Sequence, residues 1–163
     1  LLEEVGKDAA RFFYVSRSND QHLNFDLDLA KAKNNDNPVY YIQYAHARIH
    51  KVFQELSRND FDFDKNSGIS GLGLLSTNHE TEIITRLGDY PNVIALSADH
   101  YSVHSLANYL LEVAQLFHSY YNAHRFLVAD NEIRNARLAL IAAVAIVIKD
   151  GLSLLGVSAP EQM

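Results

Sequence analysis

The sequence contains no cysteine, and one methionine and three prolines stand among its 163 residues. Without cysteine the chain has no disulfide framework and no thiolate zinc site. Long hydrophobic runs are also absent: the wholly apolar stretch at residues 138–148 is far shorter than the roughly 20 residues that a membrane-spanning helix needs. These absences exclude a disulfide-stapled domain and a helical membrane span, and they favour a cytoplasmic protein that contacts no membrane.

An excess of positive charge is missing as well. The 14 lysines and arginines are outnumbered by 20 aspartates and glutamates, which gives a formal net charge of −6. A protein that binds nucleic acid without regard to sequence is expected to be basic, so this class is disfavoured. Local recognition stays possible, because a module that reads a few unstacked bases needs stacking surfaces and a few cations.

The chain begins Leu1-Leu2-Glu3-Glu4, an acidic start with neither an initiating methionine nor the basic leader of a secretory signal. We therefore expect a fragment of a longer protein. Its length suits one domain with an extra element at one end. The polar segment at residues 33–37 marks the expected boundary, with residues 1–36 as a remnant of a preceding region and residues 37–163 as a helical domain.

Apolar residues recur at helical spacing in several segments, and no segment alternates convincingly with the period of a strand. Residues 57–73, which are rich in glycine, asparagine and aspartate, are expected to form an exposed loop. The pattern predicts an all-α fold, a helical bundle. We expect helices over residues 7–18, 38–56, 77–87, 91–97 and 102–124, and a last helix that begins after Asp130 and is ended by Gly156.

The second of these helices opens with a distinctive pattern. Asn37 can cap its free amides, and Pro38 suits the first turn, where a missing N–H costs nothing. The helix then places Tyr41, Ala45 and Arg48 four and three residues apart. Such residues share one helical face.

Tyr44 lies beside this face, and the apolar side of the same helix points elsewhere. A helix with an apolar back and a front of tyrosine, a small residue and arginine can stack an unpaired base and neutralise a phosphate. The alternative is that these tyrosines are half-buried core residues whose hydroxyls reach water.

Eight histidines invite a metal hypothesis, since His46 and His50 are four residues apart, as are His100 and His104. No glutamate follows the first histidine of either pair, and no third ligand is obvious, so we expect no metal site. A polar contact within the bundle or to RNA is the expected role of His46. The sequence also lacks a nucleophile elbow and a phosphate-binding glycine loop, so no catalytic residue is predicted.

Four segments carry a family resemblance that spans nearly the whole chain and is weakest between residues 61 and 99. Together they resemble the C-terminal, DALR-type anticodon-binding domain of bacterial arginyl-tRNA synthetases and the region that precedes it. The segments are VGKDAARFFYVSRSNDQHLNFDLDLAKAKNNDNP, NPVYYIQYAHARIHKVF, SLANYLLEVAQLFHSYYNAHRFL and ARLALIAAVAIVIKDGLSLLGVSAPEQM.

The resemblance implies a role in tRNA anticodon recognition, with the anticodon loop of tRNA(Arg) and the rest of the synthetase as partners. It carries the family's contact positions onto Tyr41, Ala45, Tyr121 and Met163, and we add Arg48 from its place on the Tyr41 face. Residues 1–36 are then the remnant of the catalytic and stem-contact region. We expect the chain to be a monomer.

The resemblance also implies that the parent enzyme attaches arginine to tRNA with ATP and magnesium. The HIGH-like and KMSKS-like signatures of class I synthetases do not occur here, so this fragment is expected to bind no ATP and to be inactive alone. Two positions depart from the family pattern: Gln162 replaces an expected arginine, and Asn24 replaces an expected aspartate. The rival hypotheses are a helical protein–protein interaction module without an RNA role and a metal-dependent helical hydrolase.

Overall fold

The computed structural model describes residues 5–18 and 26–163, and within these ranges it contains helices and no strand. The predicted all-α bundle is therefore confirmed, while Asn24 lies outside the described residues. None of the described helices has the length and apolar character needed to cross a bilayer. The helices are α2 (Lys7–Val15), α3 (Leu27–Lys31), α4 (Pro38–Arg58), α5 (Lys65–Ser70), the short 3-10 helix η1 (Gly71–Leu74), α6 (Asn78–Gly88), α7 (Tyr90–Asp99), α8 (Val103–Ala123) and α9 (Asn131–Leu154).

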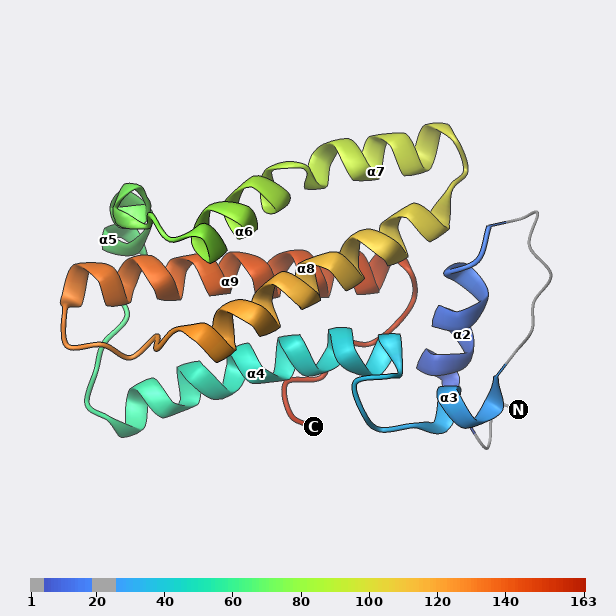
Figure 1. Ribbon diagram of the computed structural model, residues 1–163, viewed down its shortest axis with the longest axis horizontal. Coiled ribbons are helices and arrows are strands. Elements are labelled where there is room, and N and C mark those ends of the chain that lie inside the picture. Colours follow the sequence, from blue (N-terminus) through green and yellow to red (C-terminus); the bar gives the residue numbers. More distant parts are fainter. Residues whose placement is uncertain (1–4, 19–25) are drawn as a thin grey trace.

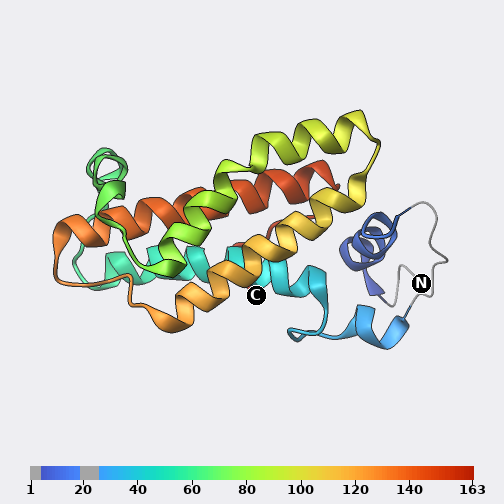
Figure 2. The same cartoon turned by 45° about the horizontal axis from the view of Figure 1, so that its top comes forward.

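The bundle is built around α9, which packs against α4, α5, η1, α6 and α8 (Figure 1). Its apolar run supplies fully buried side chains such as Leu138, Ile141 and Val144. Helices α2 and α3 lie at one end of the bundle and α5 lies at the other (Figure 2). The apolar run at residues 138–148 thus contributes one buried face to the core, while Ile146 on its other face is 64% exposed.

Local signals fix most helix ends as expected. Thr77 and Glu80 form a reciprocal capping box at the start of α6, and the Asp130 carboxylate accepts hydrogen bonds from the first amides of α9. Gly156 has a φ of +69°, a left-handed conformation that favours glycine after a helix. Asn37 differs from the prediction: it stands at the N-cap position of α4, but its side-chain amide donates to the carbonyls of Ala30 and Ala32 instead.

The expected exposed loop at residues 57–73 is wrong in its second half, where α5 and η1 form and pack against α9. Asp64 caps α5 by accepting from the amides of Asn66 and Ser67. Gly68 lets α5 approach α9 closely, because a Cβ built there would lie 2.4 Å from the Asn135 carbonyl oxygen. Contact with α9 therefore stabilises a helix too short to form by its own propensity.

Contacts cross the predicted boundary at residue 37. The Arg11 Nε donates to the Leu155 carbonyl at 2.6 Å, and the Gln43 amide donates to the Asp8 carboxylate at 3.0 Å. Helix α2 also packs against α4 and α8. Residues 7–15 thus belong to the packed body of the molecule, and the division of the chain at residue 37 stays a prediction.

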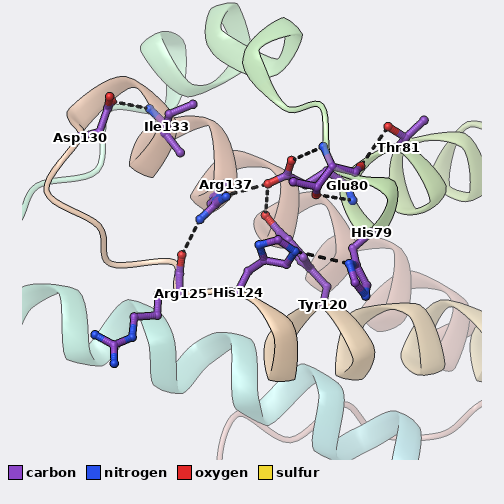
Figure 3. Close-up of polar contacts among 10 residues, drawn as sticks. His79, Glu80, Thr81, Tyr120, His124, Arg125, Asp130, Ile133 and Arg137 are labelled. Atoms are coloured by element: carbon purple, nitrogen blue, oxygen red, sulfur yellow. Dashed lines mark hydrogen bonds and ion pairs between the residues drawn. The ribbon is translucent and has the colours of Figure 1, made fainter.

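A buried carboxylate, that of Glu80, joins three helices (Figure 3). Glu80, which is 1% exposed, accepts from Arg137 Nε at 3.0 Å and from the Tyr120 hydroxyl at 2.9 Å. Burial alone raises the pKa of Glu80, but its hydrogen bonds with Thr77, Tyr120 and Arg137 together hold that pKa below its ordinary value. Glu80 is therefore ionised at neutral pH and fixes α6 against α8 and α9.

Candidate nucleic-acid interface

A groove of about 440 Å³ lies where α4, the end of α8 and the C-terminal residues 157–163 meet. The three segments are distant in the sequence, so folding alone creates this surface. Its walls combine aromatic rings, cations and carboxylates. The lining residues are Tyr44, Ala47, Arg48, Lys51, Gln54, Glu55 and Arg58 from α4, Tyr121 from α8, and Glu161, Gln162 and Met163 from the C-terminal segment.

Arg48 is the central side chain of the groove. Its guanidinium carbon lies 4.6 Å from the Tyr44 ring centroid and 4.4 Å from the Tyr121 ring centroid, within the range of cation–π attraction. Tyr121 is in turn supported by the rings of Phe117 and Phe126, with centroids 5.9 and 5.8 Å away. The two tyrosines and the arginine thus form a supported, half-exposed platform.

The predicted site residues fall into three groups. Arg48, Tyr121 and Met163 line the groove together, and Met163 is 52% exposed. Tyr41 is half-buried next to it, with its ring centroid 4.4 Å from that of His118, while the groove wall itself uses Tyr44. Ala45 is fully buried and does not line the groove, and its place as a contact position for the anticodon loop stays a prediction. It is buried because α4 packs against both α8 and α9, and position 45 is part of the core that these helices enclose.

The C-terminal segment is attached to α4 by polar side chains that point inward. Gln43 Nε2 donates to the Ser158 carbonyl at 2.9 Å, and His46 Nδ1 lies 2.8 Å from the Pro160 carbonyl. Because a carbonyl can only accept, that nitrogen of His46 carries the proton. The predicted polar role of His46 within the bundle is confirmed, and the two contacts place the end of the chain at the groove.

Sequence reasoning did not identify Gln43 as a support for the groove. The available signal was the spacing of Gln43 and His46, three residues apart on the face of α4 that also carries Val39 and Ile42. Polar side chains on a buried face require hydrogen-bond partners. The sequence alone does not say that those partners are carbonyls of the last residues of the chain.

The charges in the groove are mixed. Arg48, Lys51 and Arg58 supply cations, and Glu55 and Glu161 supply carboxylates. This composition agrees with the net negative charge of the whole chain and suits a ligand with an aromatic face, a few phosphates and at least one hydrogen-bond donor. A surface that holds a long stretch of backbone phosphate would carry cations alone.

The histidine pair on α4 has another use than metal binding. The ring centroids of His46 and His50 are 4.5 Å apart, but His46 is committed to the Pro160 carbonyl and His50 lies 4.0 Å from the Glu161 carboxylate. Across residues 5–18 and 26–163, no three residues of the types His, Cys, Asp and Glu gather in an arrangement that could hold a metal ion.

The buried histidines predict a loss of stability in mild acid. Burial lowers the pKa of both His46 and His118 below the ordinary value of 6.5. As the pH falls, the unfolded chain takes up these protons before the folded chain does. The stabilisation is therefore present above pH 6.5 and is lost as the pH falls through the folded pKa of each histidine.

We expect the melting temperature to be lower at about pH 5 than at about pH 7.5, as followed by circular dichroism. A loss of 1 kcal/mol lowers the melting temperature of a chain of this size by roughly 2–4 °C, which is easily resolved. The variant His46→Gln keeps a donor for the Pro160 carbonyl but cannot titrate, so its pH dependence should be flatter. A melting temperature that stays constant or rises on acidification would contradict the assignment.

Comparison with known proteins agrees with this geometry. The DALR anticodon binding domain family matches residues 42–163. An arginine–tRNA ligase of Coxiella burnetii is 58% identical over all 163 residues of this chain, which correspond to 28% of the length of that relative. The chain thus spans less than a third of this curated relative.

Solved structures show the same fold. A crystal structure from Campylobacter jejuni, assigned as an arginyl-tRNA synthetase, has a TM-score of 0.87 and 30% identity over 99% of this chain and 34% of its own. The arginyl-tRNA synthetase of Thermus thermophilus has a TM-score of 0.78 and 29% identity over 98% of this chain and 27% of its own. Because the family match covers well over half of the sequence, this chain belongs to the family of DALR anticodon-binding domains.

Proposed function

We propose that this chain binds the anticodon loop of an arginine tRNA as one domain of an arginine–tRNA ligase. The main support is the groove in which Arg48, Tyr121 and Met163 meet from three separate segments. The family match and the similarity to arginine–tRNA ligases support tRNA as the ligand of this groove. The attachment of arginine with ATP and magnesium belongs to the remainder of the parent enzyme.

The genetic code identifies the anticodon base that all arginine tRNAs share and that the groove is expected to recognise. All arginine codons have guanine at the second position, so every arginine anticodon has cytosine in the middle. The pairing edge of cytosine presents one amine donor and two acceptors. Arg48 can donate to the two acceptors, and the Glu161 or Glu55 carboxylate, or a carbonyl near Met163, can accept from the amine.

Stacking supplies the remaining affinity. A cytosine turned out of the loop can lie against the ring of Tyr121, and such base–aromatic stacking contributes about 1–3 kcal/mol. Lys51 and Arg58, which line the groove and are exposed, can neutralise the flanking phosphates. Binding here anchors the tRNA so that its acceptor end reaches a distant active site, which is binding energy used for orientation.

The proposal extends to the partners, the oligomeric state and the cellular location of the protein. The chain acts with the rest of the synthetase, as a monomer, in the cytoplasm, where aminoacylated tRNA is consumed. Size-exclusion chromatography with light scattering tests the monomeric state.

The direct test is binding of this chain to an arginine anticodon stem-loop with its middle cytosine intact or replaced by uracil, at one fixed salt concentration. Uracil carries a donor at N3 where cytosine has an acceptor, so Arg48 then faces an N–H. We expect the uracil stem-loop to bind at least roughly tenfold more weakly, because one buried polar group is then left without a partner. Equal binding of both RNAs would show that this groove does not discriminate the base. No binding of either RNA would mean either that the rest of the synthetase is needed for binding or that the chain is a protein–protein interaction module.

A further inference from the structure

His118 is a buried histidine of α8, just behind the wall of the groove. It is 5% exposed. Its ring centroid lies 4.4 Å from that of Tyr41 and 5.7 Å from that of Tyr44, so it packs against the α4 face that carries Arg48. The proposed RNA contacts do not use this side chain, yet its two ring nitrogens both have partners.

The hydrogen bonds of His118 define its tautomer. Arg48 Nη1 lies 3.2 Å from Nδ1 of His118, and a guanidinium can only donate, so Nδ1 accepts. The proton is therefore on Nε2, which donates to the Tyr41 carbonyl at 3.1 Å. Burial lowers the pKa of His118, the Tyr41 hydrogen bond raises it and the Arg48 charge lowers it, which leaves a neutral ring at pH 7.

The hydrogen bond to His118 Nδ1 restricts the position of the Arg48 guanidinium. Among the described residues, the contact with His118 is the one protein hydrogen bond of this guanidinium. Its Nε and Nη2 groups thus keep their donors for a ligand in the groove. An arginine side chain has many rotamers, and fixing one of them before binding removes an entropic cost from the binding step.

We infer that His118 is a positioning residue for RNA binding, which holds the Arg48 guanidinium over the Tyr44 and Tyr121 rings with its remaining donors available to the groove. The inference rests on the proposed function, because it names the residue that prepares the groove for its ligand. It makes His118 and Arg48 one unit, so that the contribution of His118 depends on the presence of Arg48.

A double-mutant cycle tests this dependence. Binding of the arginine anticodon stem-loop is measured by fluorescence anisotropy for the wild type, Arg48→Ala, His118→Phe and the double variant. We expect His118→Phe to weaken binding about three- to tenfold in the wild-type background and to have almost no effect in the Arg48→Ala background. Equal factors in both backgrounds, or no weakening in the first, would overturn the inference.

Two further variants distinguish a loss of Arg48 positioning from a general disturbance of the fold. In His118→Asn the amide oxygen replaces the Nδ1 acceptor, so binding should recover most of the loss seen in His118→Phe. His104→Phe makes the same change near the start of α8, where His104 is half-buried and lines no part of the groove, and it should leave binding unchanged. Melting curves establish that each variant is folded.

An NMR measurement decides the inference without RNA, so its failure is distinguishable from failure of the proposed function. Long-range ¹H–¹⁵N spectra of the wild type should show His118 protonated on Nε2. The Arg48 guanidinium resonances should be shifted by the two tyrosine rings, and in His118→Phe they should move towards those of a free arginine. An Nδ1-protonated tautomer, or Arg48 resonances that His118→Phe leaves unchanged, would overturn the inference.

Discussion

The variant Tyr121→Ala is expected to bind the arginine anticodon stem-loop about 5- to 150-fold more weakly than the wild type, since base–aromatic stacking contributes about 1–3 kcal/mol. Its ring also supports the Arg48 guanidinium, whose carbon lies 4.4 Å from the ring centroid. Removal of the ring therefore takes away a stacking surface and one of the two aromatic contacts of the main cation. Fluorescence anisotropy at fixed salt measures the loss.

Two matched variants show whether the ring or the hydroxyl is responsible and whether the position matters. Tyr121→Phe keeps the ring and its packing on Phe117 and Phe126, so it should bind within about twofold of the wild type. Tyr101→Ala removes a ring that is 85% exposed in the turn before α8 and should have no effect. If Tyr121→Ala binds RNA as the wild type does and melts at the same temperature, Tyr121 is not part of the interface.

The parts of the fold that local chemistry determines could be predicted from the sequence. The capping box of Thr77 and Glu80 and the carboxylate cap of Asp130 act over three residues, and α6 and α9 begin within a residue of where the sequence predicts. The long helices follow from the spacing of their apolar residues. The failures concern segments whose conformation depends on distant partners, such as α5, where Gly68 makes close contact with α9 possible.

In the candidate site, too, local helical spacing could be predicted from the sequence, and contacts between distant segments could not. Helical spacing correctly brings Tyr41, Ala45 and Arg48 to neighbouring positions, but it does not say which of them the other helices cover. Ala45 is covered, and Arg48 is only partly so. Which side chains of α4 are buried depends on how α8 and α9 pack against this helix, and this is a property of the tertiary structure. The place of Met163 likewise depends on the hydrogen bonds of the C-terminal segment to Gln43 and His46.

Removal of the buried carboxylate of Glu80 is expected to have the largest effect on stability. Glu80→Ala leaves Arg137, whose side chain is 15% exposed, without its ion-pair partner and leaves the Tyr120 hydroxyl without its acceptor. Breaking a buried pair in this way costs about 3–5 kcal/mol. At roughly 2–4 °C per kcal/mol for a chain of this size, the melting temperature should fall by about 6 °C or more.

The ion pair of Arg86 and Glu112 serves as a control, because its charged atoms are closer together than those of Arg137 and Glu80 but more exposed to solvent. Arg86 Nη2 lies 2.6 Å from the Glu112 carboxylate, closer than the 3.0 Å between Arg137 and Glu80, but the Glu112 side chain is 54% exposed against 2% for Glu80. Exposed pairs contribute about 0–1 kcal/mol, so Glu112→Ala should lower the melting temperature by no more than a few degrees. The double variant Glu80→Leu with Arg137→Leu should recover part of the loss of Glu80→Ala, because it leaves no unpaired charge in the core. If Glu80→Ala is no more destabilising than Glu112→Ala, the buried carboxylate does not hold α6, α8 and α9 together.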